Sequence, residues 1–184
     1  MTAALRADFL EALRRLATVF DAYEAETGAR PVLAGGAAAS IYTGGMITSG
    51  DFDVIAAADE VFDVVMADHG FRREDRAGHL LVGYYHPDIP TIGVQLVSGR
   101  LFDDRTDPQR ITLLPIEDGG TIALAPIEDM IADRLGQFAA SGDRDEEMLE
   151  RARLLFKLAG DIDREYLIKR VLEETGDPAR LRLR

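Results

Sequence analysis

The chain has 184 residues and no cysteine, which excludes disulfides, thiolate metal sites and a cysteine nucleophile. Hydrophobic residues make up 47% of it and charged residues 29%, as is typical of a folded protein and not of a disordered one. The formal net charge of −12 repels polyanions, so nucleic acid is a disfavoured partner. The arginine clusters, which are Arg72, Arg73 and Arg76 and then Arg180, Arg182 and Arg184, are interpreted as a solvated hairpin edge and a frayed chain end.

The N-terminal region predicts a long amphipathic helix. Its apolar residues recur at helical spacing from Leu5 to Tyr23, and Gly28 marks the expected end. Charges run throughout this segment, so there is no apolar core of a signal peptide, and no uninterrupted membrane-spanning stretch follows. We therefore expect a cytoplasmic protein without membrane contact.

The next segment predicts a strand, a glycine turn and a helix. The apolar run 32–34 reads as a core strand, and Gly35 and Gly36 follow it directly. Residues 37–42 have small side chains and good helix propensity. The free N–H groups at the start of such a helix would face a ligand above the glycines, and phosphate is the natural ligand there.

Residues 51–55 alternate carboxylate and apolar side chains, which is the pattern of a half-buried strand. With a period of two, Asp51 and Asp53 project to one face while Phe52 and Val54 project to the other. Two adjacent carboxylates are the hard oxygen ligands that Mg²⁺ requires. The sequence therefore predicts a magnesium site beside the phosphate site.

Further elements follow along the chain. A helix is expected from about residue 58 to Gly70, then strands over 71–74, 79–86 and 91–97. Residues 111–116 and 121–124 flank a turn in which Gly119 and Gly120 are expected to supply the positive φ of a hairpin. From Pro126 the pattern is helical, and three helices are expected to pack beside the sheet.

These elements define an α/β (α+β) fold with a mixed β-sheet and flanking helices, followed by a C-terminal helical bundle. We expect a core over residues 1–125, including the N-terminal helix, and a helical extension over 126–184 that packs on the core.

The segments Leu33 to Gly36 and Ser49 to Asp53 together resemble the signature of the nucleotidyltransferase superfamily, which has a polymerase-beta-like fold. The chain is most similar to minimal bacterial members related to the toxin of abortive-infection toxin–antitoxin pairs. A serine two positions before the first aspartate belongs to that motif, and Ser49 matches it. The resemblance implies that Gly35, Gly36 and Ser49 bind a nucleoside triphosphate, and that Asp51 and Asp53 are catalytic and hold Mg²⁺.

A second stretch supports the resemblance, which covers roughly residues 31 to 160. Residues 126–135 resemble the helix that follows the catalytic sheet in those proteins, although the family usually has lysine where Arg134 stands. Asp143 to Asp145 resemble their arginine–aspartate pair, but Met148 replaces a further aspartate. The resemblance implies accessory catalytic contacts for Arg134 and Asp145, with the arginine on phosphate.

The largest departure from the family concerns a third carboxylate on a later strand. Gln95 stands at the expected position, and an amide neither accepts a proton near neutral pH nor neutralises a second Mg²⁺. Asp88, Asp103 and Asp104 are nearby in sequence and are candidates to replace it, although loop aspartates are more often turn formers.

Three functions remain open at this point. The leading hypothesis is a Mg²⁺-dependent nucleotidyltransferase that moves a nucleoside monophosphate to an unknown acceptor hydroxyl. The alternative, favoured by Gln95 and Met148, is a catalytically degenerate protein that acts as a nucleotide sensor or as a toxin–antitoxin interaction module with a protein partner. The third is a structural domain whose glycine and aspartate pairs are coincidental.

Overall fold

The computed structural model describes residues 5–74, 82–98, 100–158 and 160–181. Within these residues, seven strands form one mixed sheet in the order β3-β4-β5-β2-β1-β7-β6. The strands are β1 (Val32–Ala34), β2 (Asp51–Ile55), β3 (Arg72–Glu74), β4 (Val82–His86), β5 (Ile89–Ser98), β6 (Thr112–Pro115) and β7 (Thr121–Leu124). The predicted fold class, a mixed sheet with flanking helices, is confirmed.

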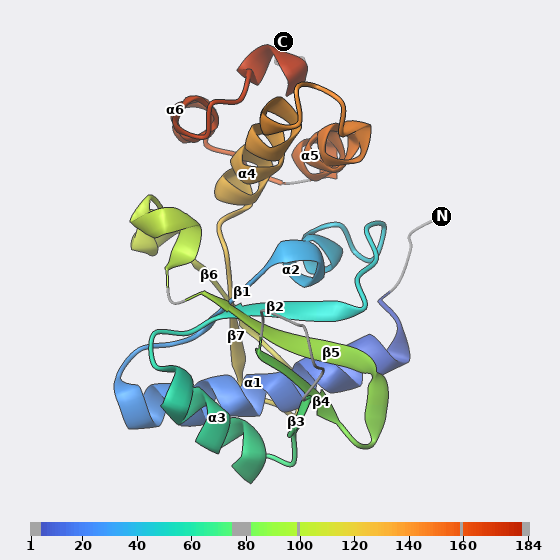
Figure 1. The fold of residues 1–184 in the computed structure, drawn as a ribbon, viewed down its shortest axis with the longest axis vertical. Helices are drawn as coiled ribbons and strands as arrows, with labels where there is room; N and C mark the ends of the chain where they lie inside the picture. The colour runs from blue at the N-terminus through green and yellow to red at the C-terminus, as the bar shows by residue number, and fades with distance from the viewer. Residues whose placement is uncertain (1–4, 75–81, 99, 159, 182–184) are drawn as a thin grey trace.

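One face of the sheet is covered by α1 (Ala7–Thr27) and α3 (Asp59–Asp68), as Figure 1 shows. The predicted apolar stripe of α1 is buried, including Phe9, Leu16 and Phe20. The helix ends as expected at Gly28, whose φ of +74° suits glycine. The core therefore lies between α1 and the apolar face of the central strands.

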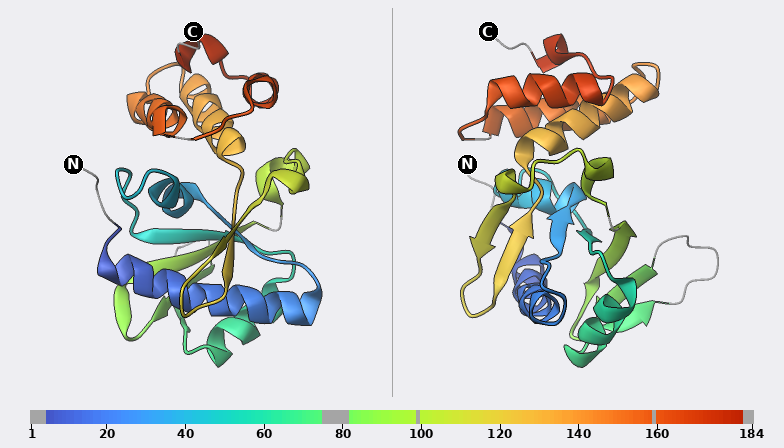
Figure 2. Two further views of the ribbon diagram at one scale, coloured as in Figure 1. Left: turned by 180° about the vertical axis from the view of Figure 1, so that it is seen from behind. Right: turned by 90° about the vertical axis from the view of Figure 1, so that its left-hand side faces the viewer.

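The opposite face carries α2 (Gly35–Tyr42), which follows β1 directly (Figures 1 and 2). We expected this helix to begin after the glycine pair, but it begins at Gly35 itself. Small side chains at 37–39 let it lie close to the sheet, and all three are buried. The glycines are therefore the first turn of the helix, at the position where its N–H groups are free.

The predicted strands and hairpin are present, with one correction in the turn. Strands β6 and β7 pair antiparallel, and Gly119 N–H donates to Ile116 O at 3.0 Å. The positive φ belongs to Asp118, at +55°, and not to the glycines as predicted. Gly120 is needed for close approach instead, because a Cβ there would lie 2.5 Å from Ala17 O on α1.

The C-terminal part contains the three predicted helices α4 (Ile127–Ala140), α5 (Glu146–Leu158) and α6 (Arg164–Glu173). They pack mainly on one another, and α4 and α5 also contact α2. Figure 1 places them beyond α2 and not flat against the sheet, contrary to our expectation that they lie beside it. The bundle has a second buried centre of its own, in which α4 and α6 share the fully buried pair Asp129 and Arg170.

Two sequence predictions fall partly outside the described residues. They are the beginning of the strand expected over 79–86 and part of the arginine clusters, because residues 75–81 and 182–184 are outside the described ranges. In the part of the chain that is described, no helix combines the length and apolarity needed to cross a membrane. The division into residues 1–125 and 126–184 stays a prediction.

Candidate functional site

The turn from β1 to α2 is built around Gly35. Its φ is +62°, a left-handed conformation that side chains rarely adopt. A Cβ at this position would lie 1.8 Å from Oδ2 of Asp53, so the aspartate carboxylate lies directly against the glycine backbone. Ala34 pairs with Asp53 across the antiparallel β1–β2 ladder, which brings the two segments together. The sequence motif and the carboxylate pair are therefore parts of one site.

The two aspartates lie side by side on one face of β2. Phe52 and Val54 are fully buried on the other face, whereas Asp51 is exposed and Asp53 is half-buried. The period-two pattern of the sequence predicted this arrangement. Oδ1 of Asp51 lies over Gly93 of β5, only 2.6 Å from where a Cβ would be, so a second glycine makes room for a carboxylate.

The environment of Asp53 disfavours its charged form. Burial is the main cause that raises the pKa of this carboxyl, and the neighbouring charge of Asp51 adds to it. The backbone N–H of Gly36 and the positive charge of Arg134 act in the opposite direction. The Gly36 N–H and Arg134 do not fully offset the repulsion between Asp51 and Asp53. A cation between the two carboxylates would relieve it.

Ser49 closes the loop that leads into β2. Its hydroxyl donates to the backbone oxygen of Asp51 at 2.7 Å and accepts from the Asp51 N–H at 3.3 Å. A Cβ on Gly36 would lie 2.8 Å from this hydroxyl oxygen. Ser49 thus lies against the first turn of α2, and the structure brings together Gly35, Gly36, Ser49, Asp51 and Asp53.

Arg134 reaches the same turn from α4. The side chain is buried, with 5% of its surface exposed, and it donates to the backbone oxygens of Met130 at 2.9 Å and Gly35 at 3.1 Å. Its Nε has no hydrogen-bond partner among the described residues. Burial lowers the pKa of the guanidinium. In this structure Arg134 therefore supports the backbone of the glycine turn, in a place where its charge also acts on Asp53.

Asp145 lies at the start of α5, where its contacts are local. Its backbone N–H donates to Ser141 Oγ at 2.9 Å, and its Oδ1 accepts from the Met148 N–H at 3.3 Å. These are the bonds of a residue that caps a helix N-terminus. The capping contact explains an aspartate at this position without reference to the carboxylate pair.

Gln95 stands where the sequence resemblance led us to expect a third carboxylate. It is the direct partner of Asp53 in the parallel β2–β5 register. The candidate replacements are engaged elsewhere: Asp88 pairs with Arg15, Asp103 with Arg105 and Asp104 with Arg100, at 2.8 to 3.3 Å. Over the described ranges, no three His, Asp or Glu side chains are grouped as a metal site would require. The protein therefore offers two carboxylates and an amide here.

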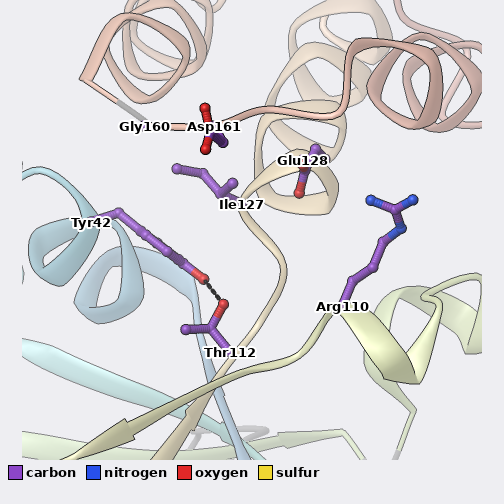
Figure 3. Close-up of a pocket in the computed structure, with 7 residues that line it drawn as sticks. All are labelled: Tyr42, Arg110, Thr112, Ile127, Glu128, Gly160 and Asp161. Atoms are coloured by element: carbon purple, nitrogen blue, oxygen red, sulfur yellow. Dashed lines mark hydrogen bonds between the residues drawn. The ribbon is translucent and has the colours of Figure 1, made fainter.

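Two cavities flank α2 and the carboxylate strand. The first, of about 310 Å³, lies where β6 and the C-terminal helices meet α2, and Figure 3 shows its lining. Several of its polar groups are paired: the Tyr42 hydroxyl bonds Thr112 at 3.3 Å and donates to Ala125 O at 2.9 Å, and Glu128 accepts from the Asp163 N–H at 3.0 Å. Nε of Arg110 is buried and has no hydrogen-bond partner among the described residues.

The second cavity lies at the far end of β2 and has a volume of about 440 Å³. We call it the strand-end cavity. Its lining residues are Tyr23, Ala29, Arg30, Val32, Ile55, Ala57, Leu101, Asp104, Thr106, Pro108 and Ile111. The sequence pattern did not predict this cavity. The feature of the sequence that could have indicated it is Ile55, which continues the face of Asp51 and Asp53 with the same period.

No protein-family model matches the chain, and no curated protein matches it significantly. Solved structures do. An antigenic nucleotidyltransferase-like protein from Paracoccidioides brasiliensis superposes with a TM-score of 0.60 at 17% identity, covering 93% of this chain and 89% of that one. ANT(2")-Ia, solved in complex with adenylyl-2"-tobramycin, superposes with a TM-score of 0.54 at 13% identity, covering 92% and 98%. The chain therefore has a nucleotidyltransferase-like fold.

Proposed function

We propose that this protein binds a nucleoside triphosphate with Mg²⁺ and transfers the nucleoside monophosphate to an acceptor hydroxyl. The observation that carries the proposal is the contact between the glycine turn and the carboxylate pair. Gly35 lies against Asp53, and Gly36 lies against Ser49 at the first turn of a helix. A helix N-terminus, which is a favourable place for a phosphate, thus adjoins two carboxylates on one strand face. The nucleotidyltransferase-like fold supports the same function.

The donor set fits one Mg²⁺ that is shared with a nucleotide. Mg²⁺ is commonly held by one or two protein carboxylates together with substrate phosphates and water. Asp51 and Asp53 supply the carboxylates, and the glycine close to each of them leaves space for its oxygen atoms. The ion would neutralise charge on the phosphate that is attacked. Gln95 contributes no charge, so a second ion held by three carboxylates is not part of the proposal.

The chain's own residues would position the reaction. The α2 N-terminus, with Gly36 and Ser49 close together, would hold the leaving phosphates. The acceptor oxygen would attack the α-phosphorus in line, the bond from that phosphorus to the bridging oxygen would break, and pyrophosphate would leave. The hydroxyl proton would pass to water, because the amide of Gln95 does not accept it. Arg134 would act as a positioning residue through Gly35 O.

One observation favours a second candidate function. Gln95 directly opposite Asp53 is what a nucleotide sensor that no longer catalyses transfer would have. Such a protein would bind nucleotide with Mg²⁺ and would not turn it over. A protein partner of the toxin–antitoxin kind is a prediction of the sequence resemblance and belongs with this candidate.

The test is a thermal-shift titration of each nucleoside triphosphate with and without Mg²⁺, followed by an assay for pyrophosphate release. We expect a Mg²⁺-dependent rise in Tm that Asp51→Asn and Asp53→Asn abolish, since ligands that bind only the folded state stabilise it. Asp68→Asn is the matched control, because it makes the same change at an exposed position on α3.

The outcomes separate the candidates. Nucleotide binding with pyrophosphate release supports transfer. Nucleotide binding without pyrophosphate release, whichever acceptor is added, supports the sensor. No Mg²⁺-dependent shift with any of the nucleotides would overturn both.

A further inference from the structure

The strand-end cavity lies at the end of the sheet, where it adjoins the face that carries the carboxylate pair and is also lined by Tyr23 of α1. Asp51, Asp53 and Ile55 alternate with the buried Phe52 and Val54, and Ile55 lines the cavity. Because a strand rises about 3.3 Å per residue, Ile55 follows Asp53 by roughly 7 Å along this face. Val32, the ladder partner of Ile55, lines the cavity from β1. The cavity thus begins one side chain beyond the proposed metal ligands.

The order of groups along β2 indicates on which side of the reacting phosphorus the cavity lies. Ser49 and Gly36 lie at the beginning of the strand, Asp51 and Asp53 follow, and Ile55 comes last. In-line transfer requires the leaving phosphates and the attacking oxygen on opposite sides of the reacting phosphorus. If Ser49 and Gly36 hold the leaving phosphates, the acceptor must approach from the end of β2 where Ile55 lies.

The lining of the cavity is largely apolar, and its charges are already paired. Val32, Ile55, Leu101 and Ile111 supply aliphatic surface. Arg30 pairs with Asp21 at 2.6 Å and with Glu24, and Asp104 pairs with Arg100 at 3.2 Å. No lining charge in this described region is therefore left to select a charged ligand. A charged group placed there would lose its hydration without gaining a partner.

One polar atom of the lining is unsatisfied. The hydroxyl oxygen of Thr106 is buried and has no hydrogen-bond partner among the described residues. Buried hydroxyls are nearly always hydrogen-bonded, so this oxygen is an unsatisfied polar group inside the wall. It has almost no accessible surface, so it offers no hydrogen bond to a ligand in this conformation. The wall itself is the segment after β5, which Figures 1 and 2 place on the same side of the sheet as α2 and the C-terminal helices.

From these observations we propose that the strand-end cavity is the acceptor subsite, and that it takes an uncharged, largely apolar group adjacent to the reacting hydroxyl. The inference rests on the proposed transfer reaction for its role, but not for the binding of apolar molecules to the cavity. A nucleobase has similar chemistry, and the experiment separates it from an acceptor.

The probe is N-phenyl-1-naphthylamine, an uncharged aromatic amine whose fluorescence rises on apolar binding. We expect saturable binding that weakens by about tenfold or more in Ile55→Glu, because a carboxylate in the cavity is desolvated. Leu113→Glu is the matched control: Leu113 is 59% exposed on β6 and does not line the cavity. Ala57→Trp is a second variant. Ala57 is an exposed lining residue, so the larger side chain should fill the cavity while leaving the core intact.

Three results would overturn the inference. They are no saturable binding to the wild-type chain, equal loss of binding in Leu113→Glu, and displacement of the probe by a saturating Mg²⁺–nucleotide, which would assign the cavity to the base. Retention of the probe in the presence of nucleotide supports the acceptor subsite.

Asp51→Asn should leave probe binding unchanged. Probe binding without any nucleotide binding therefore contradicts the proposed function and the acceptor role, and leaves an apolar binding site. Nucleotide binding without probe binding contradicts this inference alone.

Discussion

The carboxylate of Asp53 lies against the backbone of Gly35, at a distance that only a residue without a side chain permits. A Cβ on Gly35 would be 1.8 Å from Oδ2 and 2.7 Å from Cγ of the aspartate. The same glycine has a φ of +62° and offers its carbonyl oxygen to Arg134. One residue thus joins the strand, the helix start and the buried cation of α4.

Replacing Gly35 by alanine should therefore cost more than its backbone conformation alone. We expect Gly35→Ala to lower the free energy of unfolding by more than Gly28→Ala, as measured by urea denaturation. Gly28 has a similar φ of +74° but no atom within 4 Å of its would-be Cβ, so its cost is the left-handed conformation, about 1–2 kcal/mol. Equal losses in the two variants would contradict the close contact with Asp53.

The raised pKa of Asp53 predicts how stability depends on pH when Mg²⁺ is absent. Because the folded state binds this proton more tightly than the unfolded state, stability falls as pH rises from the unfolded value of 3.8 through the folded pKa. Asp53→Asn should therefore be more stable than the wild type at pH 7. The difference should vanish below about pH 4, where both states of the wild type are protonated. Thermal unfolding in EDTA across this range is the measurement, and a less stable variant at pH 7 would contradict the sign.

Placing a carboxylate at Gln95 should make the proposed metal site more dependent on metal. Gln95→Asp places a third negative charge opposite Asp53, so Tm without Mg²⁺ should fall. Added Mg²⁺ should raise Tm by more than it does in the wild type, and pyrophosphate release should increase. Gln109→Glu makes the equivalent change at an exposed position, and its response to Mg²⁺ should match that of the wild type. A matching response in both variants would place Gln95 outside the metal site.

The packing of α4 on α6 should depend on one buried ion pair. Arg170 donates to Asp129 at 2.5 Å, and both side chains are fully buried. Arg170→Met would leave the Asp129 carboxylate buried without its cation, and should lower the free energy of unfolding by about 3–5 kcal/mol. Lys169→Met removes the neighbouring cation, whose side chain is 68% exposed and lies 3.8 Å from Glu173. That variant should lose no more than about 1 kcal/mol in the same denaturant titration.

Local pattern was sufficient for most elements of the core. The alternation of residues 51–55 predicted the strand and the face of each aspartate, because successive strand side chains point in opposite directions. Helical spacing predicted α1, because residues at that spacing share one face of a helix, and Gly28 predicted its end. Gln95 was predicted as the neighbour of the pair, and the β2–β5 register places it opposite Asp53.

The sequence predictions were wrong or incomplete where a contact between distant segments determines the structure. Gly120 is required because α1 passes close to it, and nothing near it in the chain reports that contact. Within the C-terminal helices, α4 and α6 are joined by Asp129 and Arg170, which bury their charges against each other across a separation of 41 residues. The strand-end cavity arises from residues of β1, β2 and the segment after β5, so no continuous stretch of sequence describes it.

By itself, the sequence determined the local conformations, the face on which the two carboxylates lie and the turn that needs glycine, since these depend on side-chain period and backbone freedom. Only the tertiary structure decided that Asp53 lies on Gly35, that Arg134 holds the glycine turn through its carbonyl oxygen, and that an apolar cavity adjoins the pair. These relationships depend on strand register and on packing between distant segments, which side-chain patterns along the chain do not encode.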